Sequence, residues 1–219
     1  MLGTLLDFLF PPRGGEWLLR AEREDGLLRY MEPVVTEAGV TALLPYDEPL
    51  VRAAVVETKF HGNERAARML SIVLAAYLQD ELRERSAYED RTCVLVPVPL
   101  SQARFRERGY NQAEVIARYA SSALGLALDT ELLVRTRDTT PQTSLGGTAR
   151  RRNLRGAFSL TRAPDPAHLY MVIDDVTTTG STLCEAAAAF DSAVTLALAQ
   201  SNGGDGGIRT HEGFYPLPR

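Results

Sequence analysis

The chain has 219 residues, 45% of them hydrophobic and 24% charged, and its net charge is −4. This ordinary globular composition excludes collagen-like, coiled-coil and wholly disordered proteins. The negative charge argues against a general nucleic-acid binder, although a local basic face is compatible with it. The two cysteines, Cys93 and Cys184, form no CxxC pair, so we expect neither a zinc site nor a disulfide framework.

The amino-terminal stretch MLGTLLDFLFPP is apolar, but it contains Asp7, has no basic segment before the apolar run and ends in two prolines. It therefore does not have the pattern of a signal peptide. No run of the chain reaches the ~18 apolar residues of a membrane-spanning helix. From these features we expect a soluble, cytoplasmic protein.

The hydrophobic pattern predicts alternating helices and strands. Residues 2–10 are expected to form a short helix that ends at two prolines, and residues 13–33 are charged without a clear period. Strands are predicted at 40–46, 92–99, 169–176 and 194–200, with a shorter one within 128–137, and helices at 49–62, 64–84, 112–125 and 181–190. This alternation predicts an α/β fold with a mostly parallel sheet covered by helices on both faces.

The most informative segment is MVIDDVTTTGSTLCEAA (171–187), in which a hydrophobic strand ends in Asp174 and Asp175 and a helix begins soon afterwards. Ligands of open α/β sheets bind outside the carboxyl ends of the strands, and a helix N-terminus offers free N–H groups to an anion. The connecting residues can therefore surround a phosphate group: Thr177, Thr178, Thr179, Gly180, Ser181 and Thr182. Because the two acids can accept hydrogen bonds from sugar hydroxyls, the segment predicts a ribose 5-phosphate site. The plainer alternative is a strand end followed by a helix cap.

This segment resembles the fingerprint with which type I phosphoribosyltransferases bind phosphoribosyl pyrophosphate (PRPP). The stretches ETKFHGN (57–63), VPVPLSQARFRERGYNQAEVIA (96–117) and RTRDTTPQTSLGGTARRRNLRGAF (135–158) are similar to segments of the ComF/GntX family, phosphoribosyltransferase-like proteins associated with DNA uptake. The resemblance implies a type I phosphoribosyltransferase-like domain over 45–200. A short extension over 1–44 precedes it, and a Gly-rich tail over 201–219, expected to be poorly ordered, follows it.

The resemblance also assigns roles to basic residues. The loop after the strand at 92–99 is expected to face the pyrophosphate of PRPP through Ser101, Arg104 and Arg108, since arginine offers forked donors to phosphate oxygens. The alternative is a solvated arginine run that opens a helix, and Arg106 is expected to be a bystander. Asn111 and Gln112 are either helix-cap residues or ligand contacts.

The stretch 138–155 has no periodicity and is expected to be a mobile hood that closes over the site and contributes Arg150. Its alternative is a solvent-exposed loop with a basic patch. The amino end departs from the family pattern: relatives commonly carry a four-cysteine zinc module after an LFPP-like stretch. Here LFPP (9–12) is followed by no cysteine before Cys93, so we expect no protein-bound metal.

The two aspartates raise a geometric question, because successive strand residues point to opposite faces. Either the chain bends at Asp174–Asp175, or one of the side chains serves the fold. The resemblance favours a bend that places both carboxylates near the ribose hydroxyls.

The activity implied by the resemblance is substitution at the anomeric carbon of PRPP, with Mg²⁺ held through PRPP and pyrophosphate as leaving group. No general base stands out, and the acceptor is unknown. A second hypothesis is a non-catalytic PRPP- or nucleotide-binding accessory protein that works with the DNA-uptake machinery. A third is a single-strand DNA binder. Missing interleaving of aromatic residues with the arginines counts against it, so nucleic acid is not expected as a direct ligand.

Overall fold

The computed structural model describes residues 14–85, 91–137 and 156–201. The expected helix at 2–10, the hood at 138–155 and all but the first residue of the 201–219 tail lie outside these ranges. Within them, no helix combines the length and the apolar character needed to cross a bilayer.

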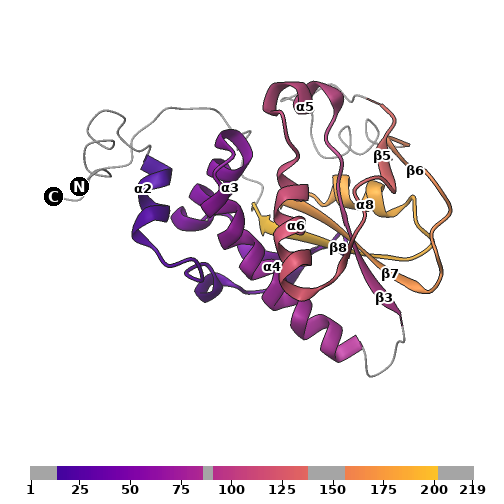
Figure 1. Cartoon of the computed structure of the whole chain (residues 1–219), viewed down its shortest axis with the longest axis horizontal. Coiled ribbons are helices and arrows are strands. Elements are labelled where there is room, and N and C mark those ends of the chain that lie inside the picture. The colour runs from indigo at the N-terminus through magenta and orange to yellow at the C-terminus, as the bar shows by residue number, and fades with distance from the viewer. Residues whose placement is uncertain (1–13, 86–90, 138–155, 202–219) are drawn as a thin grey trace.

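A six-stranded sheet in the order β1-β2-β8-β7-β3-β4 forms the centre of the protein (Figure 1). Its strands are β1 (Val34–Val35), β2 (Thr41–Pro45), β3 (Thr92–Pro97), β4 (Ala127–Leu128), β7 (His168–Thr177) and β8 (Ala193–Gln200). The pairs β2–β8, β8–β7, β7–β3 and β3–β4 are parallel, whereas β1 runs antiparallel to β2. The predicted α/β class with a mostly parallel sheet is thereby confirmed.

Helices cover one face of the sheet, and a helix with a hairpin covers the other. On the first face lie α3 (Pro49–His61), α4 (Glu64–Arg85) and α6 (Gln112–Leu124), and α2 (Gly14–Ala21) packs against α3. On the second lie α8 (Ser181–Ala187) and the antiparallel pair β5 (Leu133–Arg135) and β6 (Phe158–Leu160). A single 3-10 turn, Leu28–Tyr30, precedes β1.

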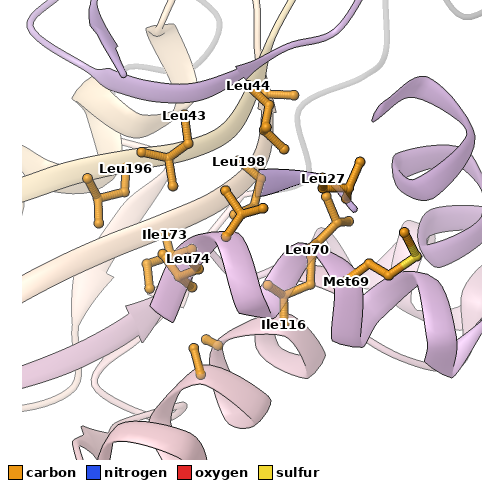
Figure 2. Packing of buried hydrophobic residues seen from close by; sticks show 14 of the residues in the cluster. Leu27, Leu43, Leu44, Met69, Leu70, Leu74, Ile116, Ile173, Leu196 and Leu198 are labelled. Carbon is orange, nitrogen blue, oxygen red and sulfur yellow. The ribbon is translucent and has the colours of Figure 1, made fainter. Parts of the chain in front are cut away.

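The alternation of side chains along β7 produces two separate cores. Met171 and Ile173 join the larger core with α4 and α6, whereas Tyr170 and Val172 join the core beneath α8. Figure 2 shows Ile173 within the larger core together with Leu74. Because β7 is buried on both faces, its sequence is nearly continuously apolar. Each fully buried Leu or Ile contributes roughly 1.5–3 kcal/mol.

Most predicted elements are confirmed to within one or two residues at each end. The helices that end at Gly62 and Gly125 do so because both glycines adopt the left-handed conformation, with φ of 59° and 68°. The helix predicted at 181–190 is shorter and ends at Ala187. The prediction of an irregular stretch at 13–33 was incomplete, since its first part forms α2.

The basic stretch after β3 was predicted as a loop, and this was wrong in part. Residues Gln102–Arg108 form the helix α5, which lies past the end of β3 at the top of Figure 1. The Arg104 amide donates to the Ser101 hydroxyl (3.3 Å), which caps the helix, and Gly109 ends it with φ of 78°. A serine before the helix and a glycine after it are ordinary helix boundaries, and the prolines upstream obscured them.

The described part of the 1–44 segment is continuous with the sheet. It supplies the hairpin strand β1 and most of β2, and the expected boundary at residue 45 falls at the last residue of β2.

Candidate functional site

Three stretches that are far apart in the sequence meet at the carboxyl ends of the central strands. They are the end of α3, the end of α5 with the turn into α6, and the end of β7. β3 and β7 end side by side, and the Val98 amide continues their pairing by donating to the Ile173 carbonyl (2.8 Å). Three of the four stretches that carried the family resemblance, around 57–63, 96–117 and 171–182, therefore come together at one edge of the sheet.

The centre of this region is an ion pair between β7 and α3. Nζ of Lys59 lies 3.2 Å from Oδ2 of Asp175, and only 13% and 6% of the two side chains are exposed. The two charges are therefore largely shielded from water. An ion pair in such a buried place interacts more strongly than one at the surface. Sequence reasoning included Lys59 in the resemblance but did not assign it to the site.

The two neighbouring carboxyl groups have opposite ionisation behaviour. Burial raises the pKa of Asp174 to about 8, and the negative charge of Asp175 adds to the rise. Burial also acts to raise the pKa of Asp175, but the Lys59 ammonium and hydrogen bonds outweigh it, so that pKa lies below its ordinary value. The two shifts are therefore opposite in direction: the pKa of Asp174 lies above the ordinary value of an aspartate, and the pKa of Asp175 lies below it.

The backbone at the aspartates stays regular. β7 keeps the same register with β8 from Tyr170 to Thr177, so the pairing is not broken at Asp174–Asp175. Asp175 is buried, whereas Asp174 is half-buried. The carboxyl group of each aspartate accepts a hydrogen bond from the backbone amide of the next residue, and the distance is 2.9 Å in both cases. The bend that the resemblance favoured is therefore not present, and the approach of both carboxylates to a ribose stays a prediction.

Tyr110 fixes the end of α3, which carries Lys59. Its hydroxyl donates to the Thr58 carbonyl (2.6 Å) and accepts from the Gly62 amide (2.8 Å). These contacts span about fifty residues of sequence, so they connect the RGYN turn to the KFHG turn. Sequence reasoning missed Tyr110, although its place in the RGYN segment of the resemblance was a signal that could have found it.

Arg108 lies in the same junction. Its guanidinium is half-buried, stacks over the Phe60 ring at 5.1 Å and donates to Oε1 of Gln112 (3.1 Å). Burial lowers the pKa of Arg108, and the negative charge of Asp175 counteracts this effect. Of the basic residues predicted to face pyrophosphate, Arg104 and Arg108 lie in the described part of the chain, and the charge of Asp175 acts on Arg108.

The other residues of the α5 region that the sequence analysis discussed have different surroundings from those of Arg108. Ser101 is buried as the cap of α5, and Arg104 is exposed on that helix. Arg106 is exposed and bonded to Gln102, in agreement with a bystander role. Arg150 lies outside the described residues. Asn111 caps α6 through the Ala113 amide (3.1 Å) and donates to the Val98 carbonyl (3.0 Å), so both ends of its amide serve the fold.

The residues between β7 and α8 form a compact turn, as the sequence predicted. The Gly180 amide donates to Oγ1 of Thr177 (3.0 Å), and the hydroxyls of Thr179 and Ser181 are 2.7 Å apart. Thr178 and Thr179 are exposed, and Thr182 is half-buried in the first turn of α8. The first N–H groups of a helix have no intrahelical partner, so this turn presents donors at the sheet edge.

Gly180 is required for a reason that the sequence did not show. Its φ is 73°, as expected for a tight turn. A Cβ added there would lie 2.6 Å from Cβ of Ala38 and 3.2 Å from Cγ2 of Val40. The close approach is therefore to the β1–β2 hairpin. A larger residue at 180 would therefore disturb the fold as well as a bound anion.

A groove of about 370 Å³ lies on the outer side of this edge, between α5, the start of α6 and the segment before β5. Phe105, which is 50% exposed, lines it together with Arg106 and Gln102. Phe105 stands between Arg104 and Arg106, so an aromatic residue does interrupt the arginine run. The objection raised against a single-strand binder is thereby weakened.

The strand order, the direction of the strands and the turn between β7 and α8 define the class of the protein: an α/β domain of the type I phosphoribosyltransferase-like kind. No protein-family model matches the chain. The chain is, however, 41% identical over 140 residues to the DNA utilization protein YhgH of Escherichia coli K12 and 34% identical over 140 residues to that of Salmonella typhimurium. It is also 33% identical over 142 residues to competence protein F of Haemophilus influenzae.

These homologues confirm the resemblance to the ComF/GntX family that the motifs indicated. Each match includes 64% of this chain, and the matched part spans 60–61% of the relative's own length. The names of these relatives associate them with DNA utilization and competence.

Proposed function

We propose that the chain binds PRPP at the carboxyl ends of β7 and β3 and transfers its phosphoribosyl group to an acceptor. The observation that carries this proposal is the buried Lys59–Asp175 pair beside Asp174, directly before a hydroxyl-rich turn that opens α8. An acidic pair next to a row of amide donors matches a ligand that has sugar hydroxyls on one side and a phosphate on the other.

Each part of PRPP then has a matching group. The 5-phosphate would accept hydrogen bonds from the turn 177–182, and the ribose hydroxyls would bond to Asp174 and Asp175. The pyrophosphate would lie toward Ser101, Arg104 and Arg108, with Arg150 as a further candidate. In the reaction, the bond between the anomeric carbon and the pyrophosphate oxygen breaks with its electrons on that oxygen. The acceptor forms the new bond to carbon and loses its proton.

The donor set fits a magnesium ion held through PRPP rather than by the protein. Among the described residues there is no group of three or more His, Cys, Asp or Glu side chains arranged to hold a metal. Asp175 is moreover already paired with Lys59. Magnesium usually keeps several waters and binds substrate phosphates, where it would neutralise the charge of the leaving pyrophosphate.

The test is release of pyrophosphate from PRPP by the full chain, with and without Mg²⁺, against a panel of nucleobases and amines. Turnover with any acceptor, lost in Asp175→Asn but kept in the surface variant Arg118→Met, supports the enzyme. Calorimetry that detects no PRPP binding to the wild type would refute the proposal.

A second candidate function is an accessory role in DNA utilization without turnover. Two observations favour it. The names of the relatives refer to DNA utilization and competence, and the exposed Phe105 lies between two arginines in the sequence and lines a groove. Aromatic stacking with a base contributes about 1–3 kcal/mol in single-strand binders. This role predicts PRPP binding without pyrophosphate release, together with binding of a single-stranded oligonucleotide that Phe105→Ala weakens roughly tenfold or more. An oligonucleotide affinity that is unmeasurable in the wild type would exclude the nucleic-acid part.

A further inference from the structure

Three buried polar atoms without a hydrogen-bond partner mark the junction around Lys59. In the described residues, the buried side-chain atoms that lack such a partner are Oγ1 of Thr58, Nε of Arg108 and Oδ2 of Asp175, and of these Oδ2 of Asp175 is in ion-pair contact with Lys59. They belong to α3, α5 and β7, the three elements that meet at the candidate site. Buried polar groups are almost always hydrogen-bonded, so their concentration at one place points to a functional arrangement rather than to the packing of a core.

The position of Lys59 in this junction is defined by its surroundings. Tyr110 holds the backbone at both Thr58 and Gly62, on either side of the lysine. The neighbouring Phe60 ring is covered by the Arg108 guanidinium at 5.1 Å. The backbone that carries Lys59 is therefore fixed beside β7, and the lysine ammonium lies 3.2 Å from Oδ2 of Asp175.

Asp175 is buried and the neighbouring Asp174 is half-buried, so ionising both carboxyl groups is costly and one of them favours its protonated form. Which one does so depends on the position of the nearby positive charges. Lys59 on α3 contacts Asp175, and Arg108 on α5 is held by Phe60 and Gln112. The direct contact thus stabilises the negative charge on Asp175. The raised pKa of Asp174 and the lowered pKa of Asp175 agree with this order.

We propose that Lys59 is a positioning residue that orders the acidic pair, so that Asp175 is the charged member and Asp174 carries the proton. This inference rests on the proposed function for its consequence: a carboxylate only accepts hydrogen bonds, whereas a protonated carboxyl group also donates one. The ordered pair thus offers an acceptor and a donor to the two neighbouring hydroxyls of a ribose, and each hydroxyl can bond to the partner that suits it.

The test is a ¹³C NMR titration of the aspartate carboxyl groups in the full chain without ligand, assigned with Asp174→Asn and Asp175→Asn. In the wild type, Asp175 should titrate below its neighbours and Asp174 well above them. In Lys59→Met, the titration midpoint of Asp175 should move up by about one to three pH units. Lys59→Arg should keep it near the wild-type value. Arg52→Met, which removes an exposed cation from the same helix, should leave both midpoints unchanged.

The inference is overturned if Lys59→Met leaves the Asp175 midpoint in place, or if Asp174 is the group that titrates low in the wild type. The wild-type titration alone decides the second point, so the proposal stays testable even if Lys59→Met does not fold. Because the measurement uses no ligand, a failure to bind PRPP would refute the proposed function and leave this result standing. A merely structural role of Lys59 would lower the melting temperature without moving the Asp175 midpoint.

Discussion

Removing the positive charge from the buried pair should destabilise the protein strongly. Lys59→Met keeps the aliphatic stem but leaves the Asp175 carboxylate without its charge partner in a site where 6% of that side chain is exposed. Breaking a buried ion pair from one side costs about 3–5 kcal/mol, because the remaining charge stays desolvated. For a protein of this size, 1 kcal/mol corresponds to roughly 2–4 °C. We therefore expect a melting temperature about 6–20 °C lower at pH 7.

The matched control is the exposed pair of α6. Arg118 and Glu114 are 2.6 Å apart, but 63% and 32% of their side chains are exposed. An exposed pair contributes about 0–1 kcal/mol, so Arg118→Met should change the melting temperature by no more than about 4 °C. In the double variant Lys59→Met/Asp175→Asn, no charge is left buried, and part of the loss should be recovered.

The destabilisation should also depend on pH in a defined direction. In the wild type, the pKa of Asp175 is lowered, so the pair contributes stability above pH ~4 and loses it as the pH falls toward the lowered pKa. In Lys59→Met, burial without the lysine raises that pKa, so the carboxylate costs stability as the pH rises above ~4. The difference between the two proteins should therefore widen from pH 4 to pH 8 in thermal or urea unfolding. A Lys59→Met protein that melts within about 2 °C of the wild type at pH 7 would refute the argument.

Asp174→Asn should leave the melting temperature at pH 7 near that of the wild type, because the amide replaces the carboxyl group that we propose to be protonated. By calorimetry it should weaken PRPP binding by about two- to tenfold, the effect of one neutral hydrogen bond, and unchanged affinity would remove Asp174 from the site. Gly180→Ala should lower the free energy of unfolding by at least ~1–2 kcal/mol because of its positive φ alone, and by more because of the contact with Ala38. The variant should therefore melt at a lower temperature than the control Gly109→Ala, where φ is also positive but no atom lies within 4 Å of the added Cβ. Replacing Ala38 by glycine in that variant should recover part of the loss, and no recovery would contradict the contact argument. Finally, a chelator should leave the melting temperature unchanged, and elemental analysis that finds one zinc per chain would contradict the expectation of no protein-bound metal.

The sequence by itself determined the alternation of elements and the place of the 171–182 segment. The strands now labelled β3, β7 and β8 are nearly continuous apolar runs because they are covered on both faces, and this local signal is strong. The helices α3, α4 and α6 carry periodic apolar residues with glycines or charges at their ends. Short elements such as α5 and β1 carry weaker signals and were missed for that reason.

The assembly of the candidate site was decided by tertiary structure. The sequence could point to Asp174 and Asp175, but it could not show that α3 and β7 place Lys59 against one of them and not the other. It also could not show that Gly180 faces Ala38. Both facts depend on contacts between residues more than 100 positions apart, and no local pattern records such contacts. The charge state of the acidic pair follows from burial and from a lysine delivered by another element, and for this reason it belongs to the fold rather than to the motif.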